Sequence, residues 1–198
     1  METLVSVAVG LGLAAACGFR VFVPLLALGL AGAGGHLALA PGFTWLSSTP
    51  ALMALGTATV LEVGAYYVPW LDHLLDTIAA PTAVAAGVLA TASVVTDLPP
   101  VLKYAIALIG GGGAAGLIQG ATMLLRLKST ALTGGAGNSV VSTLELGGAV
   151  ITAALALAVP LLCLLLVVFL CTAVFRSAGR LVFGRRAKPG PEIGTDHP

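Results

Sequence analysis

The stretch Ser139–Phe175, SVVSTLELGGAVITAALALAVPLLCLLLVVFLCTAVF, decides the structural class of this protein, because it holds no basic residue and a single acid, Glu145. One helix over this stretch would be about 55 Å long at about 1.5 Å per residue, whereas the hydrocarbon core of a bilayer is about 30 Å thick. We therefore divide it at Pro160, where a helix loses a hydrogen bond and the ring clashes with the preceding turn. The alternative is one long kinked helix that projects into water.

The rest of the 198-residue chain has the same apolar character: 58% of its residues are hydrophobic, 9% are charged, and the net charge is +1. Its mean hydropathy is +1.06. Soluble domains carry about 25% charged residues, and a soluble enzyme of this size could not bury so much apolar surface. The small net charge also excludes nucleic-acid binding driven by bulk positive charge. We expect an all-α polytopic transmembrane helix bundle.

The apolar stretches predict about six spans within one transmembrane domain, residues 1–180. The spans are 4–33, 51–68, 77–95, 101–125 and the two halves of 139–175. The remaining segments are predicted as connections at 34–50, 69–76 and 126–138, and as a basic, Gly/Pro-rich, disordered cytoplasmic tail at 181–198.

The basic residues predict the orientation of the chain. Five of the nine follow Phe175, while Arg126 and Lys128 follow the fourth predicted span. The positive-inside rule places both regions in the cytoplasm. With six spans, both termini are then cytoplasmic and the protein lies in the inner membrane.

A short internal similarity suggests two inverted units of three spans, residues 1–97 and 98–180. Leu61-Glu62-Val63-Gly64 matches Leu144-Glu145-Leu146-Gly147 except at one position. Inverted repeats are typical of many transporters, although an Ala/Gly/Leu-rich sequence also produces such matches by chance.

Three charged residues lie within predicted spans, namely Arg20, Glu62 and Glu145. Each would cost about 2.5–3.5 kcal/mol at a helix centre facing lipid, so all three should face the bundle interior or a cavity. A guanidinium cannot be neutralised by deprotonation, so we expect Arg20 to pair with one or both acids. An acid that does not pair could carry a proton. Gln119, a polar residue of the fourth span, should hydrogen-bond a neighbouring helix.

The backbone around Arg20 should be irregular, with the first helix broken near Gly18–Pro24. The Pro24 ring would clash with the Arg20 carbonyl in a regular helix. A broken helix carrying a buried arginine is a candidate site for an anion or substrate. The alternative is an ion pair that fixes helix register and binds no ligand.

Two further candidate sites lie in the predicted connections. Backbone N–H groups of Gly134, Gly135, Gly137 and Asn138, with Arg126 and Lys128, could contact an anion such as a lipid phosphate, or form only a flexible capped turn. Asp72 and Asp76 could hold a cation or relay a proton, or form only a solvated interfacial turn.

Sequence motifs for enzymatic activity are absent. There is no HExxH, GxSxG, P-loop or dinucleotide fingerprint, and Cys17, Cys163 and Cys171 have no metal-ligand spacing. We therefore expect no catalytic residue, metal or cofactor, and no enzymatic activity.

Several of these motifs occur together in one known family. The chain resembles a domain-of-unknown-function family of small bacterial integral membrane proteins. The stretches that carry the resemblance are Gly18-Phe19-Arg20-Val21-Phe22-Val23-Pro24, Glu62 with Pro69 and Asp72 downstream, and Gly134-Gly135-Ala136-Gly137-Asn138 with Leu144-Glu145. The resemblance extends over residues 4–160. It implies a bacterial membrane location and no established activity.

The leading functional hypothesis is a small transporter or channel for an ion or small anionic solute, with Arg20, Glu62, Glu145 and Gln119 along its pathway. Binding or translocation of lipid phosphate head groups is one alternative. A scaffold or assembly partner that transports nothing is the other. The expected partners are membrane lipids and a small ion or anionic solute, and the glycine-rich spans would permit a homo-oligomer.

Overall fold

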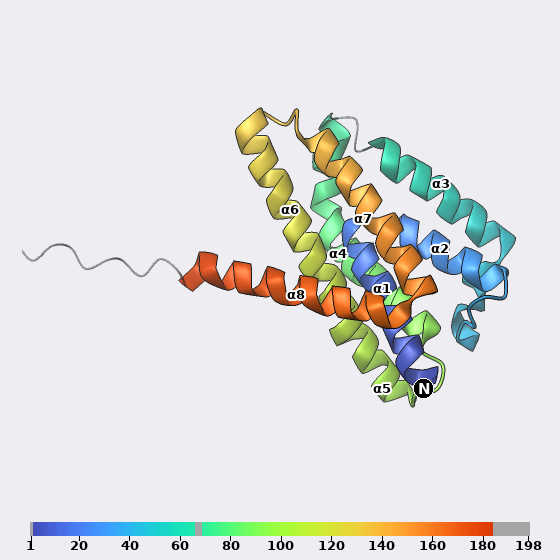
Figure 1. Ribbon diagram of the computed structural model, residues 1–198. Helices are drawn as coiled ribbons and strands as arrows, with labels where there is room; N and C mark the ends of the chain where they lie inside the picture. Colours follow the sequence, from blue (N-terminus) through green and yellow to red (C-terminus); the bar gives the residue numbers. More distant parts are fainter. Residues whose placement is uncertain (1, 66–68, 184–198) are drawn as a thin grey trace, which may run out of the picture.

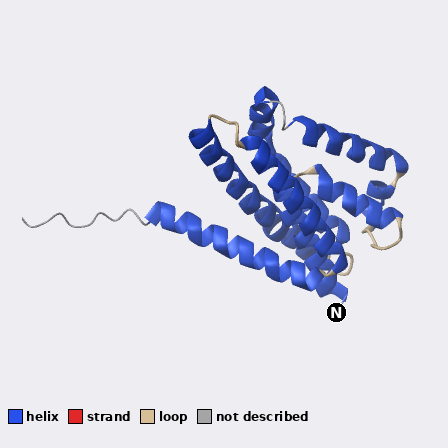
Figure 2. Cartoon of the chain, turned by 45° about the horizontal axis from the view of Figure 1, so that its top comes forward, coloured by secondary structure: helices blue, strands red, loops and turns tan. Residues whose placement is uncertain are grey.

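The computed structural model describes residues 2–65 and 69–183, without the side chains of 69–77, 178 and 180–183. Those residues form helices and no strand, which confirms the all-α fold (Figures 1 and 2). The elements are α1 (Glu2–Phe19), α2 (Phe22–Ala33), the 3₁₀ helix η1 (Pro41–Ser47), α3 (Thr49–Ala65), α4 (Pro69–Val94), α5 (Pro100–Ala105), the π-helix η2 (Ile106–Gly112), α6 (Gly113–Thr133), α7 (Asn138–Ala158) and α8 (Pro160–Phe183).

Helix α1 lies at the centre of the bundle, where it contacts α4, α6, α7 and α8 (Figure 1). Its buried residues are mostly alanine and glycine, which let helices approach closely. At Gly18 the approach to α6 is so close that an added Cβ would lie 2.6 Å from the Ala115 carbonyl oxygen. A side chain at this position would push α6 away from α1.

The expected break in the first apolar stretch is present. Helix α1 ends at Phe19, α2 begins at Phe22, and Arg20 lies between them. Pro24 falls in the first turn of α2, where backbone N–H groups have no intrahelical partner and proline is tolerated. With 12 residues, α2 is about 18 Å long at about 1.5 Å per residue and too short to cross a membrane alone.

The expected division at Pro160 is also present, since α7 ends at Ala158 and α8 begins at Pro160. Helix α8 crosses the bundle obliquely, and its C-terminal half extends beyond the other helices (Figures 1 and 2). Its exposed side chains include Leu165 and Phe169. An exposed apolar surface of this kind is typical of a helix surrounded by lipid.

Among the described residues, four helices are long and apolar enough to cross a membrane, or five if the bent pair η1 and α3 counts as one span. These helices suit a multi-pass membrane protein. The count of six spans, the inverted repeat and the orientation of the termini stay predictions.

Two of the expected connections are wrong. Helix α6 continues through Arg126 to Thr133, because leucine, arginine and lysine favour helix here, and it ends where Gly134 adopts a φ of +63°. Helix α4 already begins at Pro69, so residues 69–76 are helical. The side chains of Asp72 and Asp76 and all of residues 184–198 lie outside the described part, so the acid cluster and the disordered tail stay predictions.

Candidate functional site

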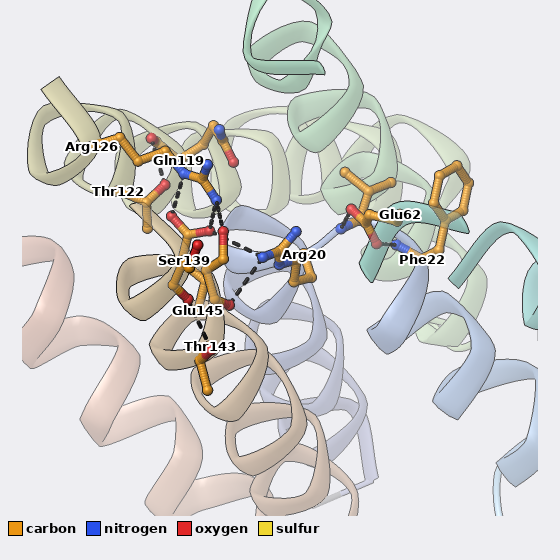
Figure 3. A network of polar contacts seen from close by, with 11 residues as sticks. Arg20, Phe22, Glu62, Gln119, Thr122, Arg126, Ser139, Thr143 and Glu145 are labelled. Carbon is orange, nitrogen blue, oxygen red and sulfur yellow. Dashed lines mark hydrogen bonds and ion pairs between the residues drawn. The ribbon is translucent and has the colours of Figure 1, made fainter. Parts of the chain in front are cut away.

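Arg20 lies in the break between α1 and α2, and only 2% of it is exposed. Its Nη2 atom donates a hydrogen bond of 3.0 Å to the Ser142 carbonyl oxygen on α7. The same atom lies 3.5 Å from Oε2 of Glu145, one helical turn further along α7 (Figure 3). The fold therefore brings Arg20, from the first predicted span, to Glu145, from the fifth predicted span.

Glu145 also pairs with Arg126, which reaches it from α6. Arg126 Nε donates to Glu145 Oε1 at 2.9 Å, and Arg126 Nη2 donates to Oε2 of the same carboxylate. Two parallel bonds of this kind form the bidentate arrangement that favours an arginine–carboxylate pair. Arg126 Nη2 further donates to Ser142 Oγ at 3.0 Å. One carboxylate thus lies between two guanidinium groups, as Figure 3 shows.

This position of Arg126 corrects the expectation that it contacts head groups from a loop. Arg126 is 4% exposed and points from α6 into the bundle. The physical reason is the Glu145 carboxylate, because a buried carboxylate is costly without a cationic partner and the bidentate pair supplies one.

Glu62 accepts hydrogen bonds from the backbone, whereas Glu145 is the acid whose carboxylate lies at the Arg20 guanidinium. Its Oε1 accepts the Val21 N–H at 2.9 Å, and its Oε2 accepts the Phe22 N–H at 3.1 Å (Figure 3). These N–H groups lie at the start of α2, where a helix has no internal acceptors. Glu62 therefore caps α2 from a separate helix, α3.

A cavity of about 50 Å³ lies between these groups. This volume leaves room for water, since one water molecule needs a cavity of about 10–15 Å³. Its walls are the break itself (19–21), Glu62 of α3, Gln119 of α6, and Ile78, Ala79 and Thr82 of α4. Three of the four residues predicted for the pathway, Arg20, Glu62 and Gln119, thus border one cavity, and Glu145 lies at the guanidinium of Arg20.

The glycine-rich turn between α6 and α7 holds these two helices together. Gly137 N–H donates to Thr133 Oγ1 at 2.9 Å, and Asn138 Nδ2 donates to Thr130 Oγ1 at 3.0 Å. Asn138 is buried, whereas Gly134 and Lys128 are exposed and Gly135 is half-buried with a φ of +96°. Of the residues proposed for a phosphate site, Arg126 and Asn138 are therefore buried in the protein, whereas Lys128 and Gly134 are exposed.

A family model described as "Domain of unknown function (DUF4126)" matches residues 7–180, which include every residue of this site. The chain belongs to the DUF4126 family. No curated protein and no solved structure matches it. The family description assigns no activity, so the chemistry of the site has to be argued from the geometry of this DUF4126 protein.

Sequence reasoning assigned Arg126 to a different site and missed Ser142 of the DUF4126 site. Arg126 is flanked by Met123-Leu124-Leu125 and Leu127, and a charge inside such an apolar run is itself a signal of a buried role. Ser142 gave no signal, because a serine within an apolar helix usually bonds its own backbone. Within the described part of this DUF4126 protein, no group of three or more His, Cys, Asp or Glu residues could hold a metal ion.

Proposed function

We propose that this DUF4126 protein is a small transporter or channel that moves a small anion across the membrane. The observation that carries the proposal is the position of Arg20, a buried guanidinium at a helix break that borders a cavity of about 50 Å³. Irregular backbone at membrane depth is typical of sites that bind ions or substrates.

The hydrogen-bond donors around the cavity favour an anion as the passing species. The formal charges of the site balance, since the two guanidinium groups of Arg20 and Arg126 are matched by the two carboxylates of Glu145 and Glu62. Both guanidinium groups stay charged at any physiological pH. An anion in the cavity would meet the Arg20 side chain and the Gln119 amide, both of which can donate hydrogen bonds.

A scaffold without transport activity is the second candidate, and the bidentate Arg126–Glu145 pair favours it. Such a pair can serve only to fix the register of α6 against α7. A lipid-phosphate site is less well supported, because Arg126 and Asn138 face protein.

Flux through proteoliposomes separates these candidates. Liposomes containing the wild-type chain are loaded with chloride, nitrate or acetate, and efflux is followed with an ion-selective electrode or by light scattering. We expect the wild type to move at least one of these anions. We expect Arg20→Gln to lower that flux about tenfold or more, since a hydrogen bond to a charged group contributes about 1.5–3 kcal/mol and 1.4 kcal/mol corresponds to a factor of ten.

Two matched variants complete the experiment. Lys128→Gln removes the same charge from an exposed residue of α6 and should keep the wild-type flux. Arg20→Lys keeps the charge without the planar fork and should give an intermediate flux. Each variant is checked for helix content and monodispersity in detergent. Equal flux in wild type and a well-folded Arg20→Gln variant, or no wild-type flux for any of the three anions, would contradict the proposal.

A further inference from the structure

Helix α3, all of whose side chains are described, is a peripheral helix with one unusual residue. It packs chiefly against α2 and lies at the edge of the molecule (Figure 1). Its apolar residues face outward, with Met53 69% exposed and Val60 71% exposed. Glu62 is the only buried residue of α3. A helix that otherwise faces its surroundings thus inserts one carboxylate into the interior of the bundle.

The place that this carboxylate occupies has the properties of an anion site. The N–H groups of Val21 and Phe22 point at it from the start of α2, where the helix dipole favours negative charge. The N-cap residue of α2, Val21, has no side chain that could serve instead. Arg20 immediately precedes these residues, is buried, and borders the same cavity. An anion is already seated there, namely the Glu62 side chain itself.

The surroundings leave room for this carboxylate to be replaced. The cavity of about 50 Å³ touches both Glu62 and Arg20, and one of its walls is Ile78 of α4, which is 53% exposed. Helix α3 meets η1 at a bend of 63°. Its contacts with the other helices are mainly those to α2. Withdrawal of Glu62 would therefore disturb no other buried side chain of α3.

We propose that Glu62 is a gate whose carboxylate occupies the anion site and is exchanged for a small monovalent inorganic anion. In the closed state Glu62 holds the Val21 and Phe22 N–H groups. In the open state the anion takes these donors beside Arg20, while α3 moves outward. This inference rests on the proposed anion transport and names the ligand class and the gating residue of the same site.

The test compares Glu62→Ala and Glu62→Gln with the wild type in two assays. The first is chloride efflux from proteoliposomes. We expect Glu62→Ala to raise efflux severalfold, because the built-in competitor is gone. Glu62→Gln keeps one oxygen acceptor and should give a smaller increase. Asp97→Asn removes an exposed carboxylate remote from the site in sequence and should leave efflux unchanged.

The second assay is thermal unfolding in detergent with chloride titrated against gluconate. In gluconate, Glu62→Ala should unfold at a lower midpoint than the wild type, because the cap of α2 is lost. Chloride should raise the midpoint of Glu62→Ala, because a ligand that binds only the folded state stabilises that state. Chloride should raise the wild-type midpoint much less, because Glu62 already fills the site. If Glu62 only caps α2, Glu62→Ala will be destabilised, chloride will not restore it, and efflux will not rise.

The two assays distinguish failure of the gate from failure of anion transport. Arg20-dependent wild-type efflux that does not rise in Glu62→Ala or Glu62→Gln overturns the gate and leaves the proposed function standing. Chloride-dependent stabilisation of Glu62→Ala without efflux in any variant supports the anion site and overturns transport. If Glu62→Ala does not fold, the smaller change in Glu62→Gln decides in both assays.

Discussion

Glu145 compensates two buried cations with one carboxylate. Its bidentate bonds go to Arg126, and its contact of 3.5 Å goes to Arg20. The three side chains come from α7, α6 and the break after α1, so this carboxylate joins three parts of the chain at one point. Removing the anion and removing one cation should consequently have unequal effects.

We expect Glu145→Gln to destabilise the protein by about 3–5 kcal/mol, the usual cost of leaving a buried charge without its partner. Arg126→Gln should cost less, because Glu145 still lies near Arg20. Thermal unfolding in detergent measures both variants, with the exposed Lys128→Gln as control. Similar midpoints for Glu145→Gln and Lys128→Gln would show that the cluster does not stabilise the fold.

At the scale of the elements, close glycine contacts set the distance between α4 and the π-helix η2. A Cβ added to Gly111 would lie 2.2 Å from Thr91 Oγ1 and 2.6 Å from the Gly87 carbonyl oxygen. Gly113, two residues later, has no atom within 4 Å of its added Cβ. The two glycines therefore offer a matched pair, one packed and one open.

We expect Gly111→Ala to lower stability by about 1–3 kcal/mol, the usual cost of overpacking, because a backbone carbonyl would have to move. Gly113→Ala should raise stability by about 0.5–1 kcal/mol, because alanine favours helix over glycine. Unfolding midpoints in detergent compare the two variants directly. Equal changes in the same direction would mean that the contact between α4 and η2 is looser than described.

For the whole molecule, the order of the helices predicts which basic residues lie on the same side of the membrane. Lys128 near the end of α6 and Arg176 at the end of the candidate span Pro160–Ser177 in α8 are both exposed. Helix α7 and nearly all of the α8 span lie between them. Two crossings return the chain to the side where it began. This agrees with the positive-inside rule, which places both basic regions in the cytoplasm.

We expect cysteines introduced as Lys128→Cys and Arg176→Cys to react with a membrane-impermeant maleimide from the same side of sealed vesicles. Inside-out and right-side-out vesicles identify that side. The native Cys17 and Cys163 are buried and should not react before unfolding, and a Cys171→Ser background removes the half-buried third thiol. Labelling of the two positions from opposite sides would show that one of the two helices, α7 or α8, does not cross the membrane.

The membrane class, the all-α fold and the two helix breaks could be predicted from the sequence, because they depend on composition and local geometry. Pro24 and Pro160 act within one turn of their own positions, so their effects need no knowledge of neighbouring helices. The same reasoning placed Arg20, Glu62 and Glu145 in the interior, since a charge inside an apolar run has few other places to lie.

Only the tertiary structure decided how these charges are paired. Arg126 lies beside Glu145, and Glu62 lies at the backbone of α2, because packing brings together helices that are distant in the sequence. The sequence also placed a loop at 126–138, because basic residues and glycines resemble a connection when the buried partner is unknown. The identity of an ion-pair partner depends on how far each helix extends and which face it turns inward, and both are settled by contacts over the whole bundle.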